Sequence, residues 1–114
     1  MDLDHARQLL ARERDRVERE LTALRAGDGE EEELSHVDQH IADSGTELFE
    51  RERDAGLVEQ LEQQLAAIAR AEARIDDGSF GRSVESGEPI PDARLEAMPW
   101  AERTVEEQAA FERR

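Results

Sequence analysis

The 114-residue chain contains no cysteine, and this absence excludes two common ways of stabilising a small protein. No disulfide can form, and no site can hold a metal ion through thiolates. Aromatic residues are also scarce, at 4% of the chain, which favours a thin helical core and an elongated molecule over a thick globular one. The length suits a single domain.

Long apolar runs are missing as well. No stretch approaches the ~20 apolar residues of a membrane span, and the first ten residues are too charged for a signal peptide. We therefore expect a cytoplasmic protein that does not associate with membranes.

Positive charge is in deficit, because 30 acidic residues face 15 basic ones and the formal net charge is −15. Phosphate backbones and anionic membranes repel such a chain, so direct binding to nucleic acid is not expected. Contact with another protein is the more natural mode of action.

The segment 46–77 is predicted to form one long helix. Most of its polar positions are Glu, Gln or Arg, no proline interrupts it, and at 1.5 Å per residue it would be about 45 Å long. Its apolar residues recur at steps of three, four and seven and so lie on one narrow stripe: Val58, Leu61, Leu65, Ile68 and Ile75. A helix with so narrow a stripe needs a second helix to pack against.

The segment 2–25 supplies that partner, with apolar residues spaced seven apart. Run antiparallel, the two stripes can be placed in register as Leu3 against Ile75, Leu10 against Ile68 and Val17 against Leu61. The sequence therefore predicts a mainly α-helical protein built on an antiparallel coiled-coil hairpin, residues 1–77.

Between the two stripes, Gly27 and Gly29 are predicted to end the first helix, and the acidic run 30–33 reads as a solvated linker. The tip of the hairpin is then a polar loop of about residues 26–45. Long loops on rigid supports are often functional. We expect this end of the hairpin to be the looser one, because Leu24 would face the charged region around Arg51 and Asp54.

After Asp77 the chain becomes rich in glycine and proline, which predicts a small turn-rich base. Asp92 is a candidate N-cap for a short helix that stops before Pro99, and residues 102–114 are expected to form a C-terminal helix. The core of the base is predicted to consist of Phe80, Ile90, Leu95, Met98 and Trp100.

Two stretches resemble a known family. DGSFGRSVESGEPIPDARLEAMPWAERTVEEQ, at 77–108, resembles the C-terminal zinc finger of the DksA/TraR family, and VDQHIADSGTELFERERD, at 37–54, resembles the tip and long helix of its YteA-like branch. The succession of FG, GEPIP and RLEAMP is specific. The resemblance implies a long helical hairpin, residues 1–77, on a zinc-finger-type base with a C-terminal helix, residues 78–114.

The resemblance also implies a function. The better-known members of this family bind bacterial RNA polymerase, insert the hairpin into its secondary channel and alter the stability of promoter complexes, often together with ppGpp. The expected function is therefore that of a transcription regulator and not of an enzyme. The alternative is a structural or protein-interaction module that descends from this family, has lost zinc and docks another partner or oligomerises.

One departure from the family is large. The positions of its four zinc-binding cysteines fall at Ser83, Ser86, Thr104 and Glu107. Neutral hydroxyls are poor zinc ligands and one carboxylate cannot replace four thiolates, so we predict that the base holds no zinc. Packing of the base core, hydrogen bonds among the hydroxyls, or docking on the hairpin must then replace the stabilisation that the metal provides.

The predicted tip carries a second polar cluster: His36, Asp38, His40 and Asp43. Such a cluster could hold a divalent metal, but in a loop it is more often solvated, so no metal is predicted. An enzyme built on it is disfavoured, because two helices and a loop provide no deep pocket. By resemblance, the residues expected to contact polymerase are Asp38, His40, Asp43 and Gly45. Asp43 is equally a candidate N-cap for the long helix, and the two roles are compatible.

The remaining polar candidates are weaker. His5 is expected to be an ordinary surface residue. Arg94 and Arg103 could contact an anion such as ppGpp, or form surface ion pairs.

Overall fold

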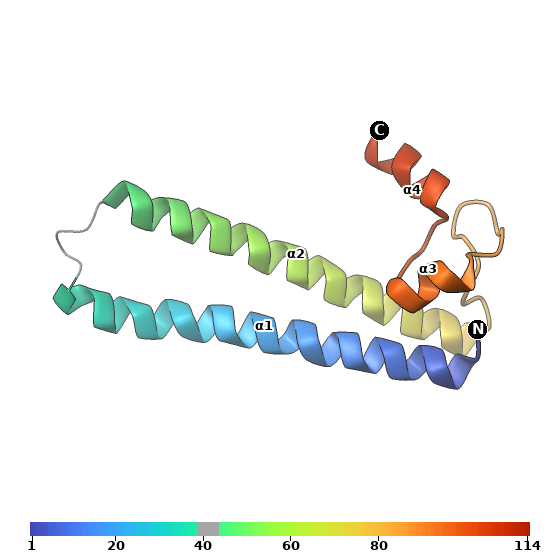
Figure 1. The fold of residues 1–114 in the computed structure, drawn as a ribbon, viewed down its shortest axis with the longest axis horizontal. Coiled ribbons are helices and arrows are strands. Elements are labelled where there is room, and N and C mark those ends of the chain that lie inside the picture. Colours follow the sequence, from blue (N-terminus) through green and yellow to red (C-terminus); the bar gives the residue numbers. More distant parts are fainter. Residues whose placement is uncertain (39–43) are drawn as a thin grey trace.

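The computed structural model describes residues 1–38 and 44–114, and the side chains of residues 1–26, 48 and 50–114. Two long helices, α1 (Leu3–Asp38) and α2 (Ser44–Asp77), lie side by side and antiparallel (Figure 1). Two short helices follow, α3 (Asp92–Ala97) and α4 (Val105–Glu112). The molecule measures 56 × 32 × 20 Å. The predicted mainly helical hairpin with a small base and a C-terminal helix is confirmed.

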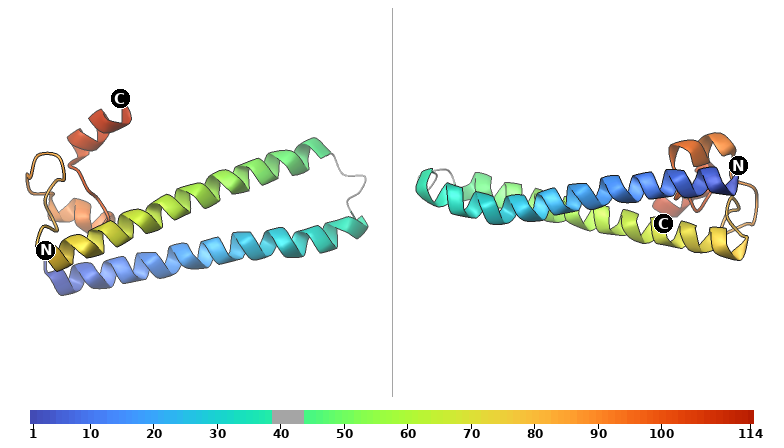
Figure 2. Two further views of the ribbon diagram at one scale, coloured as in Figure 1. Left: turned by 180° about the vertical axis from the view of Figure 1, so that it is seen from behind. Right: turned by 90° about the horizontal axis from the view of Figure 1, so that it is seen from below.

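The base lies at one end of the hairpin. The N-terminus, the end of α2 and α3 gather there, while α4 projects from the base and stands apart from the hairpin (Figure 2). No helix within the described ranges combines the length and the apolar character needed to cross a membrane.

An apolar seam, formed by buried side chains from both long helices, holds the hairpin together. It comprises Ala6, Leu10, Val17 and Leu21 of α1 with Leu61, Ile68, Ala71 and Ile75 of α2. The periodicity of the sequence predicted most of these positions. At the base end, Met1, Phe80 and Trp100 pack against the seam, so the hairpin and the base share one apolar contact region.

The predicted register of the two helices is wrong. Leu3, expected opposite Ile75, is 42% exposed, whereas Ala6 is fully buried. Ala6 belongs to the apolar seam together with Ile75, and Leu3 does not. Ion pairs between the helices agree with this shift: Arg7 with Asp76, Arg14 with Glu72 and Arg25 with Glu62.

The predicted end of the first helix is also wrong, since α1 continues through Gly27, Gly29 and the acidic run to Asp38. A glycine inside a helix costs only about 1 kcal/mol, and the glutamates that follow favour helix. The expected loop of about twenty residues is therefore mostly helix. The segment that connects α1 to α2, residues 39–43, lies outside the described residues.

Toward this connection the seam weakens, as expected. Leu24 and Val58 are only partly buried, and Leu48 and Leu57 of α2 are 57% and 40% exposed. The two helices also diverge in this direction (Figure 1). Apolar packing therefore fixes the hairpin mainly from the base to its middle.

At the other end, α2 stops at Asp77 because Gly78 adopts a φ of +83°, a conformation that other residues rarely adopt. The amides of Ser79 and Phe80 then both donate to the carbonyl oxygen of Arg74, at 2.9 and 3.1 Å. This closes the helix and turns the chain into the base.

The base has a small core of its own, in which Ile90, Leu95 and Ala101 are buried and Phe80 and Met98 partly buried. Of the five residues predicted for this core, Trp100 packs against the seam of the hairpin instead. It therefore belongs to the junction between base and hairpin.

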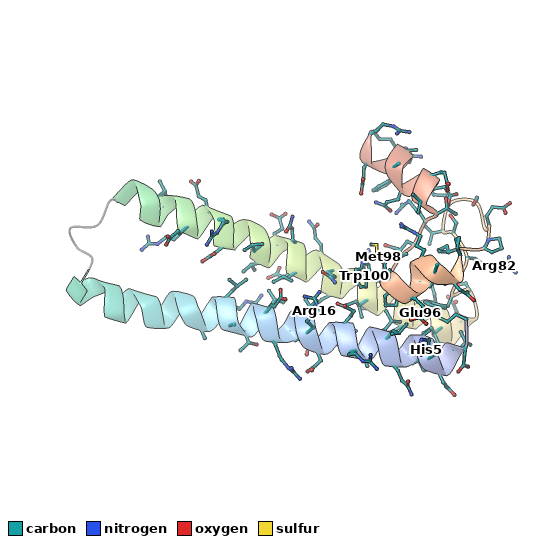
Figure 3. The ribbon with its side chains drawn as sticks, in the orientation of Figure 1. His5, Arg16, Arg82, Glu96, Met98 and Trp100 are labelled. Atoms are coloured by element: carbon teal, nitrogen blue, oxygen red, sulfur yellow. The ribbon has the colours of Figure 1, made fainter. Side chains whose placement is uncertain are left out.

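Polar contacts also attach α3 to α1. The prediction that Asp92 caps α3 is wrong, because Pro91 occupies the N-cap position and makes no side-chain hydrogen bond. The Asp92 carboxylate instead accepts a hydrogen bond from the Met1 amino group at 3.2 Å. His5 is a surface residue, as expected, and its Nε2 lies 2.5 Å from Glu96 Oε1 (Figure 3).

Replacing Leu10 with alanine should lower the free energy of unfolding by about 2–5 kcal/mol, because the fully buried side chain leaves a cavity in the seam. Leu3→Ala makes the same chemical change at an exposed position and should cost no more than about 1 kcal/mol. Urea unfolding followed by circular dichroism measures both, and equal losses would contradict the observed register.

Candidate functional site

The first candidate site lies in the turn that begins at Ser83. Ser83 is 5% exposed, and its Oγ accepts hydrogen bonds from the amides of Glu85 and Ser86 at 3.1 and 3.3 Å. Its backbone amide donates to the carbonyl of Glu88 at 2.8 Å, and its carbonyl accepts from the amide of Gly87 at 3.0 Å. These bonds fix a compact turn around the Ser83 hydroxyl.

The second half of this site is the start of α4, which forms a capping box. Thr104 Oγ1 accepts from the amide of Glu107 at 3.2 Å, and Glu107 Oε1 accepts from the amide of Thr104 at 2.9 Å. A threonine followed three residues later by glutamate is a common way to begin a helix.

The two halves of the site lie side by side, because the amide of Val84 donates to the carbonyl oxygen of Glu102 at 2.9 Å. Hydrogen bonds from the Ser83 hydroxyl, the Thr104 amide and the Ser86 hydroxyl lower the pKa of Glu107 from 4.5 to about 2, because all of them favour the charged carboxylate. The structure therefore brings together all four positions that the resemblance assigned to metal ligands. We call Ser83, Ser86, Thr104 and Glu107 the hydroxyl–carboxylate cluster.

A second polar group ties the chain before α4 to α2. The Glu102 carboxylate accepts two hydrogen bonds from Arg70, at 2.8 and 3.1 Å, and one from Arg74 at 3.4 Å. The Arg70 hydrogen bond is the main cause of a lowered pKa at Glu102, and the charges of both arginines add to it. Arg74 is only 12% exposed, and its buried Nη2 has no hydrogen-bond partner among the described residues.

A pocket of about 470 Å³ lies beside this group, lined by Arg94, Trp100, Arg103 and Phe111 among others. Trp100 and Met98, which also lines it, lie on the side of the base near α2 and α4 (Figure 3). Arg94 Nε donates to the Arg103 carbonyl at 2.9 Å. Arg103 pairs with Glu85 at 3.2 Å, and its guanidinium carbon lies 3.9 Å from the centroid of the Phe111 ring. The ion-pair interpretation of Arg103 is thus confirmed.

Sequence reasoning missed the Arg70–Glu102–Arg74 group. The one signal was that two arginines four residues apart share a face near the end of a helix. Their partner lies 28 and 32 residues further along the chain, across several turns, and no local pattern indicates it.

Comparisons with known proteins show which family and which solved structures the chain is similar to. A profile of the family described as "Prokaryotic dksA/traR C4-type zinc finger" matches residues 84–113. The solved structure of transcription factor DksA2 from Pseudomonas aeruginosa superposes with a TM-score of 0.76 and 28% sequence identity, over 97% of this chain and 83% of that one. The chain belongs to the DksA/TraR family.

Two curated relatives in the DksA/TraR family are more similar in sequence. The uncharacterized protein YteA of Bacillus subtilis is 40% identical over 74 residues, 65% of this chain and 31% of YteA. The RNA polymerase-binding transcription factor DksA of Caulobacter vibrioides is 43% identical over 72 residues, 63% of this chain and 46% of the relative. The aligned part of this chain thus spans less than half of either relative. The expected similarity to YteA is confirmed.

The zinc that the DksA/TraR family implies does not suit the residues of this chain. The hydroxyl–carboxylate cluster offers neither thiolates nor imidazoles, and backbone amides already occupy the Ser83 and Thr104 oxygens. Over the part of the chain that the structure describes, no group of three or more His, Asp or Glu side chains is placed to hold a metal ion.

The candidate tip residues of the DksA/TraR hairpin are only partly located. Asp38 ends α1, and Gly45 lies in the first turn of α2. His40 and Asp43 lie outside the described residues, and the side chains of His36 and Asp38 are also not described. Their roles remain predictions.

Replacing Glu102 with glutamine should lower the free energy of unfolding by about 1–3 kcal/mol, because the largely buried Arg74 guanidinium loses its charged acceptor. Arg70→Gln is the control, since Arg70 is 54% exposed and its removal should cost about 1 kcal/mol or less. Fluorescence of Trp100, the single tryptophan, reports unfolding of this region directly. Equal losses for the two variants would contradict the central role of Glu102.

Acid should destabilise the base. The pKa values of Glu107, Glu102 and Asp77 are all lower in the folded protein than their ordinary values, about 2 against 4.5 for Glu107. Depressed carboxyl pKa values stabilise the fold above pH 4.5, and this contribution is lost as pH falls from there toward 2. Urea unfolding monitored by Trp100 fluorescence should therefore show constant stability between about pH 5 and 7 and a steep loss below 4.5. A base whose stability does not change down to pH 3 would contradict these hydrogen bonds.

Proposed function

We propose that this protein is a DksA/TraR-type transcription regulator that binds bacterial RNA polymerase through the secondary channel, using the tip of its hairpin and no zinc. The observation that carries the proposal is the structural similarity to transcription factor DksA2 over nearly the whole chain. The name of the Caulobacter relative supports the same partner. The protein would then act in the cytoplasm and without catalysing a reaction.

In this proposal the chain has two parts, a hairpin of residues 1–77 and a base of residues 78–114. Helices of 36 and 34 residues give an arm about 50 Å long, and the apolar seam stiffens the half next to the base. The arm can therefore carry its far end into a deep channel while the base stays outside.

The chemistry of the far end also suits a protein channel better than nucleic acid. Residues 28–38 include six acidic residues and no lysine or arginine, so a phosphate backbone would repel this end. Asp38, His40, Asp43 and Gly45 are the residues that we propose to contact polymerase.

We also propose ppGpp as a second ligand of the complex. Arg94 and Arg103 beside Trp100 place positive charge and an aromatic surface along one pocket of an otherwise acidic protein. Arg103 already pairs with Glu85, so ppGpp would have to compete with that carboxylate.

One alternative has support in the sequence. The chain has lost the zinc ligands and the first acidic residue of the family's tip, where His40 now stands. A protein-interaction module that no longer binds polymerase would show both changes.

A pull-down of purified RNA polymerase core separates the two functions. The full chain should retain polymerase, whereas a variant with residues 34–47 replaced by a short turn should not, because it keeps the apolar seam and loses the tip. Running the assay with and without ppGpp shows whether the nucleotide strengthens retention. Circular dichroism should confirm that the shortened variant keeps its remaining helices.

Asp43→Asn refines the test, since asparagine caps a helix as well as aspartate and only the charge is lost. It should keep its helicity and lose its effect on promoter complexes. Failure of the full chain to retain polymerase would overturn the proposed function in favour of the interaction module.

A further inference from the structure

Helix α4 has an unusual attachment to the rest of the protein. All of its residues are described, and none of them is buried; Val105 and Phe111 are 58% and 43% exposed. Apolar packing therefore contributes little to holding it. Polar contacts with the turn at residues 83–87 and with the segment before α4 must fix its position.

One set of these contacts lies on the surface. Glu85 pairs with Arg103 at 3.2 Å and with Arg114 at 3.5 Å, and both arginines lie over the Phe111 ring. Exposed ion pairs of this kind are weak and screened by salt. The more protected link is the hydroxyl–carboxylate cluster, whose innermost side chain, Ser83, is 5% exposed.

The hydrogen bonds of Ser83 determine what its hydroxyl can do. A serine hydroxyl accepts two hydrogen bonds and donates one. The amides of Glu85 and Ser86 already use both acceptor positions of Ser83 Oγ, so its hydrogen needs an acceptor. The Glu107 carboxylate only accepts hydrogen bonds, and the segment that leads to it lies beside this turn, because the Val84 amide donates to the Glu102 carbonyl at 2.9 Å.

Ser86 and Thr104 follow the same pattern. Ser86 Oγ accepts from the amide of Glu88 at 3.2 Å and Thr104 Oγ1 from the amide of Glu107 at 3.2 Å, which leaves their hydrogens for the carboxylate. Hydrogen bonds from both hydroxyls to Glu107 contribute to its lowered pKa. The polarity of the site is the reverse of a zinc finger: positive hydrogens surround a negative centre, where thiolates would surround a cation.

We propose that Glu107 takes over the structural work of the metal ion. Its carboxylate joins the turn at residues 83–86 to the start of α4, so that the base folds without zinc and α4 keeps its position through a residue that occupies a former ligand position. The chemistry of the donors supports this, because the three hydroxyl oxygens and Glu107 Oε1 already accept hydrogen bonds from backbone amides. The inference is independent of polymerase binding.

The test compares two neighbouring glutamates in the first turn of α4. Glu107→Ala and Glu106→Ala remove the same charge near the same helix end, but Glu106 is exposed and outside the cluster. Amide hydrogen exchange, read by NMR, is followed at Glu85 and Ser86 in the opposite segment. Glu107→Ala should speed exchange at these two amides roughly tenfold or more, and Glu106→Ala should leave them unchanged.

This readout separates the proposal from simple helix capping. If Glu107 only capped α4, its removal would affect amides of α4 but not those of Glu85 and Ser86. Ser83→Ala tests the same link from the opposite side, because it leaves the capping box intact. It should still speed exchange at the amide of Gln108, which donates to the Thr104 carbonyl at 2.8 Å. If Glu107→Ala unfolds the hairpin as well, Ser83→Ala decides the question alone.

Metal analysis completes the test on the unmodified protein. The purified chain should contain far less than one zinc per molecule, and neither added zinc nor a chelator should change its melting temperature or its exchange rates. Stoichiometric zinc together with a chelator-dependent loss of structure would overturn the proposal. Equal effects of Glu106→Ala and Glu107→Ala at Glu85 and Ser86 would overturn it as well.

Discussion

The structure depends on the apolar seam between α1 and α2. Small and branched side chains such as Ala6, Leu10, Val17 and Ile68 meet along one narrow stripe of each helix, and they are almost fully buried. Burial of an apolar side chain of this size stabilises the fold by about 1.5–3 kcal/mol, so a few such contacts decide whether two polar helices pair. Fewer apolar side chains are buried toward the far end of the hairpin. Packing near the base therefore supports an acidic arm.

In our proposal, hydrogen bonds in the base do the structural work that a metal ion does in a zinc finger. The seam positions Trp100 and Phe80, and the Arg70–Glu102–Arg74 group ties the following segment to α2. The turn at residues 83–86 and the start of α4 then come close enough for the Glu107 carboxylate to join them. In this proposal, hydrogen-bond donors surround a negative carboxylate, whereas thiolates surround a cation in a zinc finger.

The sequence predicted interactions between residues close together in the chain better than interactions between distant residues. The seam positions at Leu10, Val17 and Ile68 were found because helical periodicity is a local signal. The register was not, because matching two apolar stripes by their spacing does not exclude a shift of about one helical turn. The end of α1 was also mispredicted, because Gly27 and Gly29 suggested an early end. Their cost is small compared with the helix preference of the glutamates that follow.

Within the candidate site, only the family resemblance linked residues that lie far apart in the sequence. That resemblance placed Ser83 and Glu107 together, and residue chemistry alone ruled out thiolate ligation. It did not indicate which group donates and which accepts, since this depends on backbone amides that only the folded turn presents. The partner of Arg74, Glu102, had no local signal at all.

The central claim is that the protein offers the far end of its arm, and not its base, to RNA polymerase. Site-specific photo-crosslinking measures this directly, with the crosslinker placed at Leu48, exposed on α2 near the connection, or at Arg82, exposed in the base. The account predicts that Leu48 crosslinks to the catalytic subunits of polymerase and that Arg82 does not reach the same segments. Crosslinks from Leu48 that join only two copies of this chain would contradict it.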